Sequence, residues 1–467
     1  KLDTSDLHAE AKAEVPWPVK IGFPFRAKLK TDSLANLSSL LPGNFPDVGP
    51  VEFSAHVTPG ADQLQLQNIS LKVNDSDPPQ SGKPSDLRGS LIYQPGAGPQ
   101  HPIRIRGELQ SDHFDLTLLT ESAETPDSQK SSQQAKADTE PGTLIFSDSP
   151  LPLEWIRQAD ITIDYAAENL IIPYLSIEDV QVHLLVDQDQ LQVETRSGRV
   201  AAGDFNLKLE LDGRSEEFES LLDLKIDGLQ VDQLPGLRDQ SLNLKARIDM
   251  DIELAGGGPS LHRILSGANG HAFLGITEGR IPVTGLKILT GSLFRELLQA
   301  MNPLKKKREF QELQCGSVGF RIIDGVAISR GSIVIQTPEV WHEVRGGVRF
   351  RDEVVLLALM PHPRKGIGVS AASVFNPLRL GGTLRHPLTE VDERGLFKTL
   401  AFGIGSGGVF FVIEGLTNRF IKGTGGCERA KEAYALLLEE TPETLKGSIR
   451  FRIPSSATAK EKPQNDR

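Results

Sequence analysis

The sequence predicts a mainly β protein made of repeated antiparallel strands. Three observations support this fold class: apolar and polar residues alternate over many segments, glycine (44) and proline (30) punctuate them, and helical periodicity is scarce before residue 255. Alternation with a period of two places the apolar side chains of a strand on one face and the polar ones on the other. One apolar face and one wet face are typical of antiparallel sheets.

The longest alternating segment covers residues 242–254. Its apolar positions are Leu242, Leu244, Ala246, Ile248, Met250, Ile252 and Leu254, and charged or amide side chains stand between them. Phe205, Leu207 and Leu209 follow the same pattern, and shorter alternations occur in residues 51–57, 69–73, 103–106 and 114–118. Each of these segments predicts a strand with one apolar face.

Little in the first half of the chain is expected to cover these apolar faces. Helical signals between residues 33 and 254 are limited to residues 33–41 and one or two turns in residues 151–158. A Leu-Pro-Gly break occurs at residues 41–43 and again at 234–236, which indicates a loosely repeated supersecondary plan. We therefore expect many strands, and few helices that could pack against their apolar faces.

Composition divides the chain into five parts. Residues 121–145 are rich in Ser, Gln, Glu and Lys, which predicts a disordered linker or a long loop. This segment separates a first repeated β region (1–120) from a second one (146–255). Residues 256–453 are expected to form an α+β domain, and the polar tail 454–467 is predicted to be disordered.

The α+β part has its own order of elements. The patterns predict, in sequence order, a short helix at 260–266 with Ser260 as its N-cap, a strand at 270–280, a helix at 284–301, strands within 319–335, 344–350 and 354–360, glycine-interrupted helix at 393–421, a helix at 428–438, and a strand at 448–453.

Charge and hydropathy exclude several function classes. The net charge is −11, so nucleic acid, whose phosphates repel an acidic surface, is not expected as a partner. No uncharged apolar run is long enough to span a bilayer, and the longest apolar stretch, residues 399–413, is glycine-rich. The polar first residues and the absence of a starting Met suggest a mature or truncated piece, with any targeting segment upstream.

Cys315 and Cys427 are the two cysteines of the chain. Two interpretations stay open, a buried pair of free thiols and a single disulfide. An oxidising compartment would favour the bridge. It would close a long loop, which the chain-entropy model values at about 4–5 kcal/mol.

No catalytic or metal-binding constellation is recognisable. Gly403, Gly405 and Gly408 match G-x-G-x-x-G but lack the strand–loop–helix context of a dinucleotide site. The histidines are scattered, and neither cysteine has a His partner in sequence. The basic run 305–308 suits a helix C-terminus better than a lipid headgroup site. We expect no catalytic residue, no metal and no cofactor, so the protein is not predicted to be an enzyme.

Several segments in order resemble the AsmA family of Gram-negative bacteria. They are Leu254-Ala255-Gly256-Gly257-Gly258-Pro259 followed by Thr277-Glu278-Gly279-Arg280, Phe320-Arg321-Ile322-Ile323-Asp324-Gly325, Leu380-Gly381-Gly382-Thr383-Leu384, Gly425-Gly426-Cys427, and upstream Leu151-Pro152-Leu153-Glu154-Trp155 and Val200-Ala201-Ala202-Gly203-Asp204. The likeness spans most of the chain after residue 145 and, more loosely, the part before it.

The resemblance implies an architecture, a location and a role. AsmA-like proteins are expected to be periplasmic, anchored in the inner membrane, and to form an elongated curved sheet with an apolar groove. The groove would bind or conduct phospholipid between inner and outer membrane and support outer-membrane assembly, with envelope proteins as further partners. The family contributes no catalytic residue, and the anchoring helix would lie upstream of this chain.

Residue alternation and the resemblance together nominate the residues of the groove. They are Leu242, Leu244, Ile248, Met250, Ile252, Leu254, Phe205, Leu207 and Leu209. The alternative is a non-catalytic scaffold whose sheets are closed sandwiches, because alternation by itself describes any β-sandwich. The open groove and the closed sandwich differ in whether these apolar side chains are solvent-accessible in a lipid-free sample.

Overall fold

The computed structural model divides the chain into two compact units. Unit 1 comprises residues 1–265 and 274–285, and unit 2 comprises residues 266–273 and 286–467. The structure describes residues 2–3, 7–12, 22–39, 47–74, 83–96, 102–120, 144–173, 175–215, 217–234, 245–282, 310–338, 340–363, 378–385, 387–391, 410–411, 425–442, 445 and 449–450. All statements below concern these residues.

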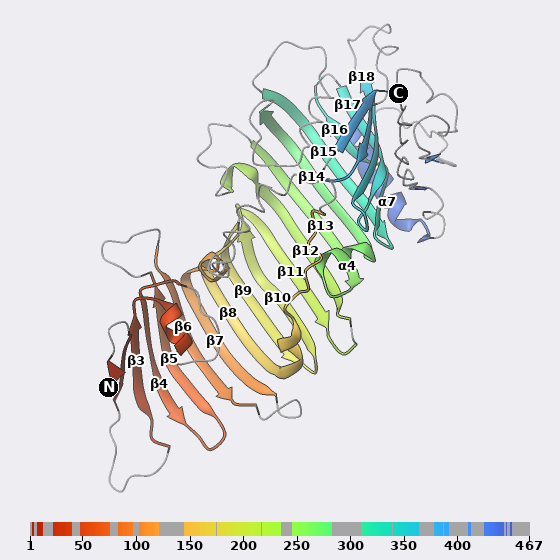
Figure 1. Ribbon diagram of the computed structural model, residues 1–467. Coiled ribbons are helices and arrows are strands. Elements are labelled where there is room, and N and C mark those ends of the chain that lie inside the picture. The colour runs from red at the N-terminus through yellow and green to blue at the C-terminus, as the bar shows by residue number, and fades with distance from the viewer. Residues whose placement is uncertain are drawn as a thin grey trace, which may run out of the picture. The chain divides into compact units, whose positions relative to one another are not determined.

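Unit 1 is a curved sheet whose strands follow one another in chain order (Figure 1). Its strands are β1 (Leu2–Asp3), β2 (Leu7–Lys12), β3 (Phe25–Thr31), β4 (Val51–Pro59), β5 (Leu64–Val73), β6 (Ser85–Gln94), β7 (Ile103–Asp115), β8 (Ala159–Ile172), β9 (Leu175–Asp187), β10 (Gln190–Val200), β11 (Gly203–Asp212), β12 (Glu219–Gln230) and β13 (Lys245–Gly257). From Leu274 onward, β14 (Asn269–Pro282) also belongs to this unit. The predicted mainly β fold is confirmed.

Neighbouring strands pair antiparallel from β1 to β13, except at one place. Strands β7 and β8 are parallel, with Ile103 opposite Ala159 and Asp115 opposite Ile171. A parallel pair needs a long crossover connection, and residues 116–158 supply it. The two β regions on either side of the linker therefore belong to one sheet in one compact unit.

The helical pieces of unit 1 are short. They are η1 (Leu34–Ser39), α1 (Thr117–Thr120), η4 (Glu154–Gln158), η5 (Val231–Gln233) and α4 (Leu261–Ser266). The helix expected at residues 33–41 is a 3₁₀ segment, and that at 151–158 is shortened to η4. Helix α4 begins after Ser260 as predicted, and the Ser260 hydroxyl accepts a hydrogen bond from the Arg263 N–H at 3.2 Å.

The expected strand over residues 114–118 is wrong in its second half. Strand β7 ends at Asp115, whose carboxylate accepts hydrogen bonds from the backbone N–H (2.9 Å) and the hydroxyl (2.6 Å) of Thr117. These hydrogen bonds favour a helical turn at Thr117 and so begin α1. They outweigh the preference of the alternating apolar residues for a continued strand.

Unit 2 combines a second run of antiparallel strands with one longer helix. The strands are β15 (Phe310–Ile323), β16 (Val326–Gln336), β17 (Val340–Arg349), β18 (Val354–Pro363), β19 (Leu378–Gly382) and β20 (Pro387–Val391), and β21 (Phe410–Phe411) pairs with β22 (Ile449–Arg450). The helix predicted at 428–438 is α7 (Gly426–Glu439).

Helix α7 is held on β15 and β16 by a disulfide and by packing. Cys315 and Cys427 are bridged, with their Cα atoms 6.4 Å apart. Val334 and Ala430 are buried beside the bridge, and Arg330 forms an ion pair with Glu440 near the end of the helix at 2.6 Å. One face of these strands is thus covered by the helix.

His342 on β17 is expected to make unit 2 sensitive to acid. The side chain is 4% exposed, and its burial, together with the nearby His362, lowers its pKa from 6.5 to about 4. His362, the charged group that acts on His342, lies 3.4 Å from Glu343, which is ion-paired with Arg345. The unfolded chain therefore binds a proton at this position before the folded chain does.

The contribution of His342 to stability is complete above pH 6.5 and is lost as the pH falls toward 4, by about 3 kcal/mol in total. Urea unfolding between pH 4 and 8 measures it, followed by the fluorescence of a chain that keeps Trp341 but has Trp17→Phe and Trp155→Phe. In that background His342→Gln should flatten the slope between pH 4 and 6.5. An unchanged slope would assign the acid sensitivity to other groups.

Several predicted features lie outside the described residues. They are the helix at 284–301, the basic run 305–308, the glycine motif at 403–408, nearly all of the linker and the tail 454–467. The helix predicted at 393–421 also lies outside them except at Phe410–Phe411, where the prediction is wrong because these two residues form β21 and pair with β22. No helix in the described part of the chain is long and apolar enough to cross a membrane.

Candidate functional site

A row of apolar residues crosses unit 1 from strand to strand. Residues that pair across a sheet lie on the same face, so the registers define the row directly. It consists of Phe25, Val57, Leu66, Leu91, Gly107, Ile163, Leu184, Val193, Leu209, Leu222 and Leu254, one from each strand from β3 to β13. At about 4.8 Å between neighbouring strands, this central row is roughly 50 Å long.

Gly107 does not interrupt the apolar surface of the central row. A Cβ atom at Gly107 would lie 2.3 Å from Cδ2 of Leu91, its partner on β6. The Leu91 side chain therefore fills the space over the glycine. A larger residue at 107 would have to displace it.

Every residue of the central row except the buried Val57 is half-buried, and on β9 the row lies between buried positions. Along β9, Val180 is 1% exposed and Val186 is fully buried, while Val182 and Leu184 between them are half-buried. Val180 and Val186 are six residues apart, about 20 Å along a strand. At β9 the apolar face of unit 1 thus has an accessible floor bounded by a covered margin on each side.

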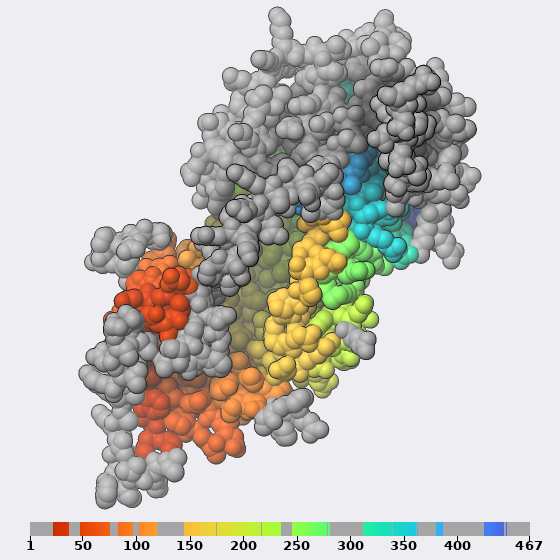
Figure 2. Space-filling view, viewed as in Figure 1, coloured from red at the N-terminus to blue at the C-terminus, as the bar shows by residue number. Residues whose placement is uncertain are grey.

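Residues 144–158, hereafter the strap, cover one margin. In Figures 1 and 2 this segment, in yellow-orange, crosses in front of β10 to β13. Ile156 of the strap is fully buried and clusters with Val186, Leu191, Leu211 and Phe218. Leu153 is half-buried against the same cluster.

The strap is fixed to the sheet at both ends. Near its start, the Ser147 carbonyl accepts a hydrogen bond from the His262 N–H at 3.1 Å, and Asp148 accepts one from the Ser260 hydroxyl at 2.7 Å. That hydrogen bond, and next to it the charge of Arg263, lowers the pKa of Asp148 despite some desolvation. Near its end, the guanidinium of Arg157 donates to the carbonyls of residues 213 and 215 at 2.9 and 2.8 Å.

The opposite margin is covered by the end of β7 and the start of the crossover. Phe114 and Leu116 pack against a buried cluster that contains Ala167, Leu170 and Val180. The N–H of Leu116 donates to the carbonyl of residue 171 at 2.9 Å, which holds the chain at this position. The accessible floor at β9 therefore lies between the cluster under the strap and this second cluster.

The other face of unit 1 is polar and ion-paired. Lys30 pairs with Glu52, Arg88 with Asp86 and Asp112, Arg106 with Asp160, Arg196 with Asp164, and Lys225 with Asp223. Two hollows, of about 830 and 550 Å³, include the ion-paired Arg88, Asp164, Arg196 and Lys225 among their lining residues. This face suits contact with water, because charged side chains are costly to bury. Its exposed ion pairs contribute little to stability.

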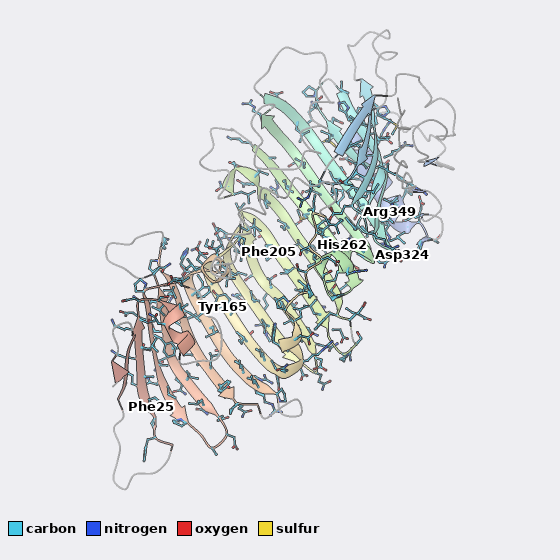
Figure 3. All side chains as sticks on the ribbon, in the orientation of Figure 1. Phe25, Tyr165, Phe205, His262, Asp324 and Arg349 are labelled. Atoms are coloured by element: carbon cyan, nitrogen blue, oxygen red, sulfur yellow. A yellow bond between two sulfur atoms is a disulfide. The ribbon has the colours of Figure 1, made fainter. Side chains whose placement is uncertain are left out.

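The structure places the described candidate residues on the apolar face. Leu209 and Leu254 belong to the central row. Leu207 and Ile252 both lie opposite Leu224, in the adjacent row of the floor. Phe205, labelled in Figure 3, and Met250 both pair with Ile226 and pack with Ile248 in the margin cluster that contains Phe114. Leu242 and Leu244 lie outside the described residues.

The strap was missed by sequence reasoning. Residues 144–158 show no alternation, and the sequence predicted only a turn or two of helix at 151–158, with residues 144–145 in the linker. The burial of Ile156 depends on strands that follow it in the chain, and no local pattern announces it. The sequence offered one indirect indication: the apolar residues Leu191 and Leu211 at the margin of the sheet required some other segment to bury them.

The described residues offer no metal site. Among them, no group of three or more His, Cys, Asp or Glu side chains is arranged to hold a metal ion. Asp148, Ser260 and His262 do lie together, but the Ser260 hydroxyl donates to Asp148 and caps α4. This arrangement orders the strap.

Comparison with known proteins identifies the family. The family model described as "AsmA family" matches residues 52–302. The chain is also 22% identical over 392 residues to the AsmA family protein YhjG of Escherichia coli (strain K12), covering 79% of this chain and 53% of that protein, so it spans about half the length of this relative. No solved structure matches the chain. The matched residues include β4 to β13, which carry the apolar floor, and the chain belongs to the AsmA family.

Proposed function

We propose that the apolar floor of unit 1 binds phospholipid acyl chains. The observation that carries this proposal is the central row, which stays apolar across consecutive strands from β3 to β13 and is half-buried at every position except Val57. Each CH₂ group removed from water contributes about 0.8 kcal/mol, so an acyl chain gains from lying on such a floor. The polar headgroup would remain at the rim, in water.

Membership of the AsmA family supports a location in the cell envelope for this proposed binding. We infer that the chain is the periplasmic part of an envelope protein anchored in the inner membrane by a segment upstream of these residues. A floor roughly 50 Å long is suited to carrying phospholipid between the inner and outer membranes. Its role would then be to support outer-membrane assembly by supplying lipid, with other envelope proteins as partners at its ends and without catalysis.

Charged residues on the floor are expected to abolish lipid binding. Leu222 and Leu254 are paired in the central row and half-buried, so Leu222→Glu with Leu254→Glu puts two carboxylates where an acyl chain would lie. Desolvating either carboxylate costs more than 1.4 kcal/mol, and we expect bound phospholipid to fall at least about tenfold. The readout is mass spectrometry of organic extracts after detergent-free purification from a bacterial periplasm.

The next residues on the same strands supply the control. Asp223 and Glu253 are also paired, and they lie on the polar face. Asp223→Ala with Glu253→Ala should leave bound phospholipid unchanged, and circular dichroism should show both double variants folded. If the folded wild-type chain carries no lipid, the floor is covered in solution and the protein is better described as a closed scaffold for partner proteins.

A further inference from the structure

The strap has distinct inner and outer sides. Ile156 and Leu153 face the sheet, and both belong to the cluster formed with Val186, Leu191 and Leu211. Leu151 and Trp155, in contrast, are 38% and 41% exposed. The strap is therefore an amphipathic segment that packs along the margin of the apolar face.

The two inner side chains have different surroundings. Ile156 is fully buried and has no remaining surface to offer a ligand. Leu153 is only half-buried, and the half-buried residues of the same cluster include Leu184, Val193 and Leu209 of the central row. Leu153 thus lies at the place where the strap meets the accessible floor over β9 to β11.

The strap is built as a fixed wall. The anchors at residues 147 and 148 hold one end, and the contacts of Arg157 with the β11–β12 turn hold the other. Arg157 also lies over the ring of Phe218, 5.0 Å from its centroid, which adds a cation–π contact. A wall fixed in this way resists displacement by a bulky ligand, since packed interiors yield little space.

We propose that Leu153 sets the width of the lipid path over β9 to β11, so that the strap selects lipids by the bulk of their acyl chains. This inference rests on the function proposed above. A slim linear chain would pass between Leu153 and the floor, whereas a chain carrying a bulky group would meet the strap. The selectivity would be local, because the strap clusters with the floor only at these strands.

The test compares two lipid probes. The purified chain is incubated with vesicles of dioleoyl phosphatidylethanolamine that contain either a trace of radiolabelled dioleoyl lipid or a trace of the same lipid with a BODIPY group inside one acyl chain. Protein-bound probe is then measured after the vesicles are removed. The ratio of bulky to linear lipid reports the width of the path, and the linear lipid alone reports the floor.

Leu153→Trp should reduce binding of the BODIPY lipid at least about fivefold while leaving the linear lipid within about twofold, because overpacking penalties act only where space is short. Leu153→Ala should shift the ratio the other way. Leu151→Trp makes the same substitution on the outer side of the strap and should change neither value. The thermal midpoint of each variant shows whether it is folded, and Leu153→Ala keeps the test decisive if Leu153→Trp does not fold.

The outcomes separate the two proposals. A wild-type chain that binds neither lipid would overturn the proposed function. A wild-type chain that binds lipid, with folded Leu153 variants that keep the wild-type ratio, would overturn the role of Leu153 alone. Equal loss of both lipids in folded Leu153→Trp would also overturn it, since a wall that selects by bulk must affect the two lipids differently.

Discussion

Replacing Ile156 with aspartate is expected to prevent the strap from docking and to destabilise unit 1 more than any other single substitution on the strap. The side chain is fully buried among Val186, Leu191, Leu211 and Phe218. An aspartate there would either bury an unpaired carboxylate, at a cost of several kcal/mol, or leave the cluster open to water. The free energy of urea unfolding, followed by the fluorescence of Trp155 next to it in sequence, is the measurement.

A graded series distinguishes packing from a general effect of mutation. Ile156→Val should cost about 1 kcal/mol and Ile156→Ala about 3 kcal/mol, because the lost transfer energy and the cavity both grow with the volume removed. Leu151→Ala, on the exposed side of the strap, should stay within about 0.5 kcal/mol of the wild type. If Ile156→Ala proved as mild as Leu151→Ala, Ile156 would not anchor the strap.

The second large effect is expected from the disulfide of unit 2. Cys315 and Cys427 are 112 residues apart in sequence, so the bridge closes a long loop in the unfolded chain. On the chain-entropy model its removal costs about 4–5 kcal/mol. The double variant Cys315→Ser with Cys427→Ser should therefore shift the urea midpoint of unit 2 strongly downward. Trp341, which packs beside the bridge, reports this transition when Trp17 and Trp155 are replaced by phenylalanine.

Reduction provides an independent comparison for the same bond. The wild-type chain unfolded and refolded in reductant should show the midpoint of the double serine variant, because both lack the cross-link. In oxidising buffer each single serine variant should match the double variant within about 1 kcal/mol, since one remaining thiol cannot close the loop. A double variant with an unchanged midpoint would mean that packing of α7 through Val334 and Ala430 suffices.

Local patterns predicted five strands of unit 1, namely β4, β5, β7, β11 and β13, and the face that each presents. The alternation in residues 205–209 and 248–254 placed the apolar side chains on one face of β11 and β13, where the registers bring them together. The prediction succeeded because the period-two geometry of a strand is a property of the backbone alone. It failed at residues 117–118, where the side chain of Asp115 caps a helix and overrides the alternation.

For the candidate site, alternation predicted the face on which the residues lie but not their position along the strands. Sequence reasoning nominated Phe205, Met250 and Ile248 as groove residues together with Leu207, Leu209, Ile252 and Leu254. The structure places Phe205, Met250 and Ile248 beside Phe114 and the others in or next to the central row, and all of them are half-buried. Residue alternation cannot make this distinction, since it assigns a face but not a position along the strand relative to a covering segment.

The sequence by itself determined that this protein is a mainly β member of a recognisable family with one apolar and one charged face per strand, because these features depend on residues close together in the chain. Only the tertiary structure decided that β7 and β8 pair in parallel, that Ile156 closes one margin of the floor, and that Cys315 meets Cys427. Each of these contacts joins residues far apart in sequence. No local propensity specifies them, and they form because the packed chain gains more from the contact than it loses in loop entropy.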